Sequence, residues 1–144
     1  MECSCPMVPV FFINHKYLPV PMAKLKVLVV EDDIDTQLFL ELLLGKYYHL
    51  VMCLNDVECY AGMRNNDIRL IVMDVALKGS MDGLQITREL KNSDQYKHIP
   101  IVCLSAHVLE NDKRLAYEAG VDVFLGKPVS NEKLLSTLDD FILR

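Results

Sequence analysis

From Leu25 onward, the chain alternates five times between a short apolar segment and a longer segment with helical spacing. The first apolar segment, Leu25–Val30, is a nearly continuous apolar run rich in β-branched valine, typical of a strand buried on both faces of a sheet. The expected strands are Leu25–Val30, His49–Leu54, Ile68–Met73, Ile99–Leu104 and Val121–Leu125. The expected helices are Asp35–Lys46, Val57–Arg64, Leu84–Leu90, Glu110–Ala119 and Asn131–Leu143. This order predicts an α/β fold, a doubly wound five-stranded parallel sheet with helices on both faces.

Several expected helices have recognisable ends. Asp33 or Asp35 can cap the start of the first helix, and Ser130 can cap the last. Gly120 is suited to end the fourth helix, because a left-handed residue commonly closes a helix there. The apolar residues at helical spacing in the first helix are Leu38, Leu42 and Leu43.

The first 21 residues differ from the rest of the chain. They carry four of its six prolines, and their only formal charges, Glu2 and Lys16, cancel. An early acidic residue and interrupting prolines argue against a secretory signal. We expect residues 1–23 to form an irregular N-terminal extension and residues 24–144 to form the domain. Met22 would make a normal start, so the extension is a dispensable arm, the product of an upstream start, or an edge strand; we favour the first.

Composition excludes several classes of protein. Apolar residues make up 51% of the chain and charged residues 24%, which is the balance of a globular domain rather than a disordered one. The apolar runs are too short to span a bilayer, so we expect no membrane insertion. The net charge is −5 and no basic block occurs, which argues against nucleic acid as a partner. Five cysteines without zinc-type or framework spacing, with Cys53 and Cys103 inside apolar runs, predict buried reduced thiols and a cytoplasmic protein.

Polar residues with related chemistry follow four of the five strands. In such a sheet, ligands bind outside the carboxyl ends of the strands, where Glu31, Asp32 and Asp74 should converge with Ser105 and Lys127. Clustered carboxylates repel one another, and Mg²⁺ would relieve that repulsion. Asp74 could act as a nucleophile toward a phosphoryl group, Lys127 could neutralise the added charge, and Ser105 could donate to a phosphoryl oxygen.

From about Lys24 to Arg144, the chain resembles the receiver domain of two-component response regulators, and within that family a stand-alone, chemotaxis-regulator-like member. The resemblance implies the flavodoxin-like receiver fold. The motifs that carry it are Val27-Leu-Val-Val-Glu-Asp-Asp33, Leu70-Ile-Val-Met-Asp-Val75, Met81-Asp-Gly83, Leu104-Ser-Ala106 and Phe124-Leu-Gly-Lys-Pro128.

The resemblance also implies a metal-assisted phosphoacceptor site. Asp74 matches the aspartate that accepts the phosphoryl group. Asp32 and Asp74 would bind Mg²⁺ directly, together with the backbone carbonyl of Ala76, while Glu31 would act through water.

Four further positions match residues of the family's site and switch. Lys127 matches the site lysine, and Ser105 matches the hydroxyl that moves when the aspartate is modified. Phe124 could simply be a core residue, but its place three residues before Lys127 favours the aromatic switch. The bond between Lys127 and Pro128 is a candidate cis peptide.

The chain departs from the family pattern in two places. The segment Val75–Met81 is one residue longer than the commonest loop, and Lys78 stands where a proline often does. This puts the path of the loop in doubt. Ser105 replaces the more usual threonine, which is a conservative change.

Three other functions compete with this interpretation. An aspartate-nucleophile phosphatase of the haloacid-dehalogenase kind would need a second aspartate at position 76, which is Ala76. A flavin or nucleotide binder would need a glycine-rich loop after the first strand, where acidic residues stand instead. A degenerate receiver that only binds proteins is disfavoured, because each expected phosphorylation residue is present.

The resemblance implies partners rather than a substrate. The phosphoryl donor would be a histidine kinase or a phosphotransfer protein. A downstream protein target would contact the face formed by the fourth helix, fifth strand and fifth helix. We therefore expect a phosphoacceptor regulator and not an enzyme. No DNA-binding sequence follows the last helix, so we expect either a stand-alone receiver or a piece of a larger protein.

Overall fold

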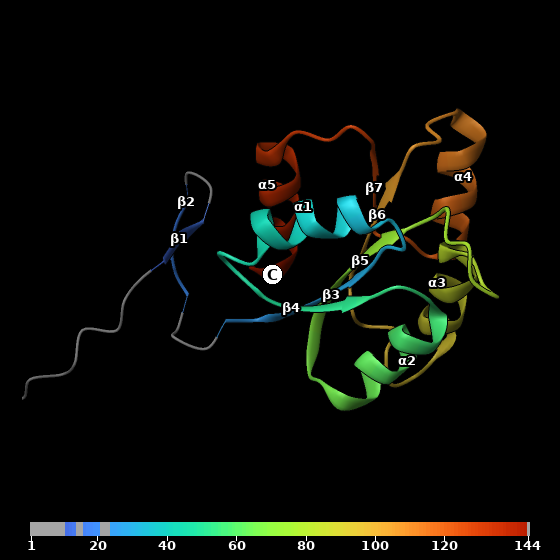
Figure 1. Cartoon of the computed structure of the whole chain (residues 1–144), viewed down its shortest axis with the longest axis horizontal. Coiled ribbons are helices and arrows are strands. Elements are labelled where there is room, and N and C mark those ends of the chain that lie inside the picture. The colour runs from blue at the N-terminus through green and yellow to red at the C-terminus, as the bar shows by residue number, and fades with distance from the viewer. Residues whose placement is uncertain (1–10, 14–15, 21–23, 144) are drawn as a thin grey trace, which may run out of the picture.

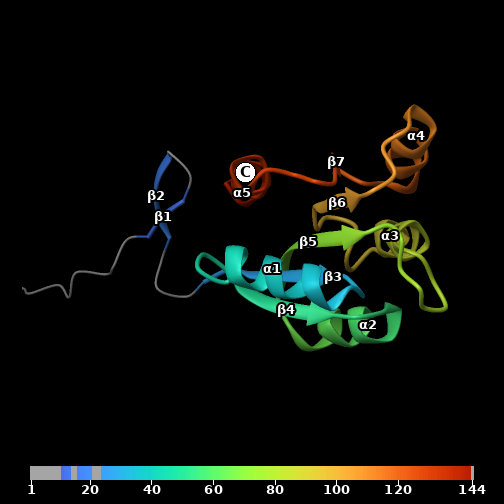
Figure 2. The ribbon, with the colours of Figure 1, turned by 45° about the horizontal axis from the view of Figure 1, so that its top comes forward.

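Five parallel strands form one sheet in the order β4-β3-β5-β6-β7 (Figures 1 and 2). The computed structural model describes residues 11–13, 16–20 and 24–143. The strands are β3 (Lys26–Val30), β4 (His49–Cys53), β5 (Ile68–Asp74), β6 (Ile101–Ser105) and β7 (Val123–Gly126). The helices are α1 (Ile34–Leu44), α2 (Asp56–Asn65), α3 (Gly83–Asn92), α4 (Glu110–Ala119) and α5 (Asn131–Ile142). Each expected strand and helix is found, with its ends within two residues of the predicted ones.

The sheet is covered on both faces, as a doubly wound fold requires (Figure 1). Successive residues of β3 point to opposite sides. Val27 and Val29 pack with residues of α1 and α5, whereas Leu28 and Val30 pack with residues of α2 and α3. All four are fully buried, and each contributes roughly 1.5–3 kcal/mol by leaving water. Their burial on both faces explains why the strand is apolar from Val27 to Val30.

The ends of the helices follow local capping chemistry. Asp33 caps α1 by accepting the backbone N–H of Thr36, and Ser130 caps α5 by accepting that of Lys133. Gly120 ends α4 with a φ of 107°, in the left-handed region that favours glycine. These ends agree with the sequence-based expectations.

Helix α1 shows one clear difference from the expected core. Leu38 and Leu42 are 53% and 65% exposed, and the side chains buried against the sheet are Leu40 and Leu44. The helix is apolar on most of its surface, so the spacing of its leucines does not decide which stripe faces the sheet. Leu38 and Leu42 form an exposed row with Ile34, which we call the α1 apolar stripe.

The N-terminal extension contains regular structure, which corrects the expectation that it is irregular. Strands β1 (Phe11–Ile13) and β2 (Lys16–Val20) form an antiparallel hairpin, in which Phe11 is paired with Val20. This two-stranded sheet is separate from the five-stranded one, and β1 approaches α5. Two extended segments can pair locally even where one of them contains a proline, provided that the pairing does not need a backbone N–H at the proline. The predicted dispensability of the extension stays a prediction.

A lysine ties α3 to the amino ends of β6 and β7. Lys91 donates from Nζ to Oδ2 of Asp122 at 2.8 Å and to the carbonyl of Ile99 at 2.8 Å. The same Asp122 oxygen accepts the backbone N–H of Ile101 at 2.8 Å. We call Lys91 and Asp122 the amino-end pair.

The cysteines in the described part of the chain are free and buried: Cys53, Cys59 and Cys103. Burial raises the pKa of each thiol to about 12. Thiolate, the reactive form, is therefore scarce at neutral pH. These three side chains act as small apolar core residues.

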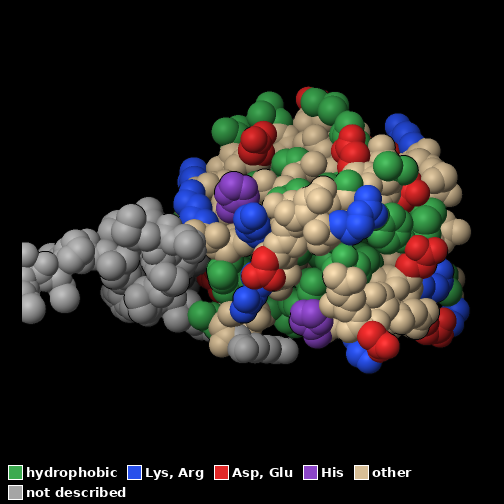
Figure 3. Space-filling view, turned by 90° about the horizontal axis from the view of Figure 1, so that it is seen from below, with side chains coloured by type: hydrophobic (Ala, Val, Ile, Leu, Met, Phe, Trp, Pro, Cys, Tyr) green, Lys and Arg blue, Asp and Glu red, His purple; other side chains and the backbone are tan. Residues whose placement is uncertain are grey.

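The outer surface carries charges of both signs. On the face seen in Figure 3, acidic and basic side chains are interspersed over the domain, and neither sign gathers into one patch. None of the helices in the described ranges has the length and apolar character needed to cross a bilayer.

Candidate functional site

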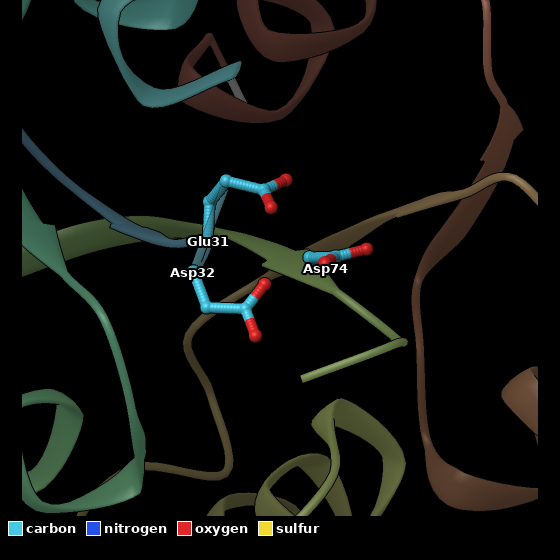
Figure 4. A group of neighbouring side chains, drawn as sticks. All are labelled: Glu31, Asp32 and Asp74. Atoms are coloured by element: carbon cyan, nitrogen blue, oxygen red, sulfur yellow. The ribbon is translucent and has the colours of Figure 1, made fainter. Parts of the chain in front are cut away.

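Three carboxylates meet at the carboxyl end of the sheet. Glu31 and Asp32 follow β3 directly, and Asp74 is the last residue of the neighbouring strand β5. One oxygen from each lies within 4.8 Å of the others. In Figure 4, Glu31 and Asp32 leave the chain on either side and both extend toward Asp74. The parallel pairing of β3 and β5 brings these residues together although they are far apart in sequence.

A single lysine contacts two of these carboxylates. Lys127 follows β7, and its Nζ lies 2.9 Å from Oε2 of Glu31 and 3.4 Å from Oδ1 of Asp74. Its backbone N–H donates to the carbonyl of Ser105 at 2.7 Å, which holds the segment against β6. The peptide bond between Lys127 and Pro128 is cis, the isomer that the resemblance implied.

Burial and charge act against each other in this cluster. Burial raises the pKa of Glu31, which is 2% exposed, although its hydrogen bond to Lys127 opposes that shift. Burial alone would lower the pKa of Lys127, but its hydrogen bond to Glu31 and the nearby charge of Asp74 outweigh it and raise the pKa. The cluster thus contains one ammonium, that of Lys127, and three carboxylates. The cluster has an excess of negative charge, which a bound cation would balance.

The loop between β5 and α3 closes over one side of the site. The backbone N–H of Lys78 donates to Oδ2 of Asp32 at 2.8 Å, and that of Ala76 approaches Oδ1 of Asp74 at 3.4 Å. Gly83 begins α3 so close to β5 that an added Cβ would lie 2.0 Å from the carbonyl oxygen of Asp74. Only glycine permits this approach, so the Asp82-Gly83 motif fixes where the loop ends.

Ser105 ends β6 beside Asp74 and is buried. Its hydroxyl donates to the carbonyl of His107 at 3.0 Å and accepts the N–H of His107 at 3.1 Å. The hydroxyl is therefore satisfied within its own turn. Ser105 lies next to the carboxylates on the neighbouring strand, with its hydroxyl bonded to His107.

Phe124 lies on β7, half-buried, with Cys103 of β6 as its partner in register. A cavity of about 80 Å³ is lined by both Phe124 and Ser105. The backbone N–H of Phe124 donates to the hydroxyl of Tyr117 on α4 at 3.3 Å. The structure thus brings the two expected switch residues to one cavity.

Two contacts at the site were not anticipated from the sequence. The Lys78 N–H on Asp32 comes from the backbone, so no residue type signals it. Gln37 of α1 donates from Nε2 to the carbonyl of Glu31 at 2.8 Å. A glutamine one turn into the helix after the acidic run is a weak signal, because glutamine is common on helix surfaces.

The comparisons with known proteins agree with this geometry. The sequence model of the response regulator receiver domain matches residues 27–139. The polar-differentiation response regulator DivK of Brucella anthropi is 27% identical over 117 residues, which cover 81% of this chain and 94% of DivK.

Solved structures give the same result. The Vibrio cholerae chemotaxis protein CheY4 superposes with a TM-score of 0.76 at 27% identity, covering 83% of this chain and 99% of that one. The receiver domain of a Pseudomonas aeruginosa sensor histidine kinase, solved with a magnesium ion in its active-site cleft, gives a TM-score of 0.78 at 26% identity. It covers 85% of this chain and all of that one. The expected flavodoxin-like receiver fold is confirmed, and the chain belongs to the response regulator receiver domain family, whose general role is to accept a phosphoryl group in two-component signalling.

Proposed function

We propose that Asp74 is the phosphoacceptor of this chain and that it takes the phosphoryl group from a phosphohistidine of a histidine kinase or phosphotransfer protein. One observation carries the proposal: Glu31, Asp32 and Asp74 meet Lys127 at one edge of the sheet, although they come from three separate strand ends. The family's role supplies the reaction class, and this cluster supplies the chemistry for it.

The carboxylates suit a hard cation. Asp32 and Asp74 would hold Mg²⁺ directly with the Ala76 carbonyl, and Glu31 would act through water, because it is already paired with Lys127. The close approach of the three carboxylates fits one small ion. The related Pseudomonas receiver domain holds magnesium in its cleft. When bound, Mg²⁺ would neutralise charge on the phosphoryl oxygens.

Asp74 and Lys127 have different roles in the transfer of the phosphoryl group. An oxygen of Asp74 forms the bond to phosphorus while the bond from phosphorus to the donor's imidazole nitrogen breaks, and the imidazole keeps that electron pair. Lys127, 3.4 Å from Asp74, neutralises charge on the new acyl phosphate. The chain modifies its own side chain and turns over no separate substrate, so it acts as a regulator.

Ser105 and Phe124 carry the signal away from Asp74. A phosphoryl group offers new acceptor oxygens, toward which the Ser105 hydroxyl turns by giving up its bonds to His107. The cavity that both residues line has room to admit part of the Phe124 ring. The surface formed by α4, β7 and α5 then changes, and a downstream protein target binds the changed surface. The response is a shift between two packings, limited by the contacts that the phosphoryl group adds.

The α1 apolar stripe supports a protein donor. Ile34 is 64% exposed and comes two residues after Asp32, so the stripe begins at the site. Exposed apolar rows of this kind are suited to pack against another helix. We also propose a cytoplasmic location, since the described cysteines are free and buried.

The proposal is tested with Mg²⁺ and acetyl phosphate or beryllofluoride. Intact-mass spectrometry of the wild type is expected to detect one phosphoryl adduct, which is lost in Asp74→Asn and kept in Asp33→Asn, the matched control from the helix cap. Undiminished labelling of Asp74→Asn would overturn the assignment. Ser105→Ala is expected to accept phosphate while losing most of the amide shift changes around Phe124 that beryllofluoride induces in the wild type.

A further inference from the structure

The loop that closes over the site is held by a second carboxylate outside it. Ser80 donates from Oγ to Oδ2 of Asp56 at 2.9 Å, and Asp56 is the first residue of α2. An added Cβ on Gly79 would lie 3.3 Å from Oδ1 of the same carboxylate. The loop backbone is therefore pressed against Asp56, which is only 9% exposed.

Ser80 comes two residues after Lys78, whose backbone N–H contacts the carboxylate of Asp32. Lys78 follows the buried Leu77 and precedes the exposed Ser80, and its backbone N–H donates to Oδ2 of Asp32. Leu77 belongs to the core beneath α2 and α3, so the loop is fixed on both sides of Lys78. The Lys78 N–H has little freedom to leave Asp32 while both anchors hold.

The direction of the hydrogen bond between Ser80 and Asp56 is fixed. An ionised carboxylate only accepts hydrogen bonds, so the Ser80 hydroxyl must donate to it. The N-terminus of α2 favours a negative charge at Asp56, and a bond from a hydroxyl to a carboxylate is among the stronger ones. The chain of contacts runs from α2 through Asp56, Ser80 and Lys78 to Asp32.

We propose that Ser80 and Asp56 are positioning residues for Mg²⁺, which they affect by holding the Lys78 N–H on one oxygen of Asp32. The inference rests on the proposed function, in which Asp32 is a metal ligand. A carboxylate oriented through one oxygen keeps its other oxygen free for a cation. Orienting Asp32 in advance removes part of the cost of ordering it when the ion binds, so the contact raises affinity.

The test measures the Mg²⁺ dissociation constant by isothermal titration calorimetry. Ser80→Ala is expected to weaken binding by about 10-fold, the lower end of the effect of removing a partner of a metal ligand. Ser80→Thr keeps the hydroxyl and is expected to stay within about twofold of the wild type. Ser136→Ala, which removes an exposed serine hydroxyl from α5, is the matched control and is expected to leave binding unchanged.

A second pair of variants separates the backbone from the side chain of residue 78. Lys78→Pro removes the N–H and is expected to weaken Mg²⁺ binding as much as Ser80→Ala, whereas Lys78→Ala keeps the N–H and the affinity. The two losses should not add in Ser80→Ala/Lys78→Pro, because they break one chain of contacts. The Lys78 amide proton shift, which reports its bond to a carboxylate, should move in Ser80→Ala and stay unchanged in Ser136→Ala.

The outcomes separate the two proposals. A wild type that does not bind Mg²⁺ contradicts the proposed function. A wild type that binds, with unchanged or tighter binding in Ser80→Ala, overturns the positioning role alone.

Discussion

The two ends of the sheet each carry a lysine beside an aspartate, but the two lysines are in different situations. At the amino ends of the strands, Lys91 meets Asp122 at 2.8 Å, and backbone groups complete the bonding of both side chains. At the carboxyl ends, Lys127 is shared between Glu31 and Asp74 at 2.9 and 3.4 Å, with Asp32 close by.

The difference lies in charge balance rather than in residue type. The amino-end pair has one cation, one anion and matched backbone partners, so its bonds serve to join α3 to β6 and β7. The carboxyl-end cluster has more carboxylates than cations, and it remains costly until a cation or a transferred group changes the balance. A residue pair that looks the same in the sequence is structural at one end and, under the proposed function, reactive at the other.

The largest expected effect comes from removing each lysine in turn. Lys127→Met should slow phosphorylation by acetyl phosphate about 100-fold, because the charge on the acyl phosphate loses its neutralising ammonium. Lys91→Met should leave that rate within about twofold. Initial rates followed by intact-mass spectrometry, on variants whose amide spectra remain dispersed, measure both. Equal slowing in the two variants would break the comparison.

Magnesium should act at one end only. At about ten times its dissociation constant, Mg²⁺ should raise the free energy of unfolding of the wild type by about 1.4 kcal/mol. The free energy of unfolding of Asp122→Asn should rise by the same amount, since Asp122 lies at the amino ends of the strands, away from the carboxylate cluster. Asp32→Asn should gain much less. Urea unfolding with and without Mg²⁺ measures the gain, and a full gain in Asp32→Asn would contradict a carboxyl-end site.

Matched aspartate substitutions should change stability in opposite directions in the absence of Mg²⁺. Asp122→Asn should lower the free energy of unfolding by about 1 kcal/mol, because Lys91 and the N–H of Ile101 lose an ionised partner. Asp74→Asn should raise it by up to about 1 kcal/mol, because one of three repelling carboxylates is neutralised. Urea unfolding midpoints of both variants, measured in the presence of a chelator, test these two changes in stability. A loss of stability in Asp74→Asn would mean that the cluster is balanced after all.

The smallest effect is expected from an exposed ion pair at the amino end. Arg69 and Asp67 lie 3.9 Å apart, and their side chains are 58% and 88% exposed. Arg69→Ala should change the free energy of unfolding by less than about 0.5 kcal/mol, because water screens such a pair. A larger loss, measured by urea unfolding, would show that amino-end stability does not depend chiefly on Lys91.

Much of the fold could be predicted from the sequence, because its three central strands, β3, β5 and β6, are mostly buried on both faces and several of its helices have clear caps. In a parallel sheet the carboxyl ends of all strands lie at one edge, and the strand order of this sheet places β3 beside β5, which brings Asp32 and Asp74 together. The alternation of strands and helices thus predicts the edge at which the carboxylates lie, and the strand order makes them neighbours.

Other features depend on information that residue types do not carry. Leu38 and Leu42 are exposed because α1 offers several apolar stripes and the sheet accepts one of them. The Lys78 N–H on Asp32 is a backbone contact made by an unusual loop. Helix α2 begins at Asp56, one residue before the expected Val57, because Asn55 caps it by accepting the backbone N–H of Glu58.

The bond from the Phe124 N–H to the Tyr117 hydroxyl has a consequence for how copies of this domain can associate. Strand β7 is an edge of the sheet, and edge strands offer free backbone groups to which another chain can add a strand. Tyr117 occupies one of those groups. A chain that adds a strand along β7 would therefore first have to break the tyrosine bond.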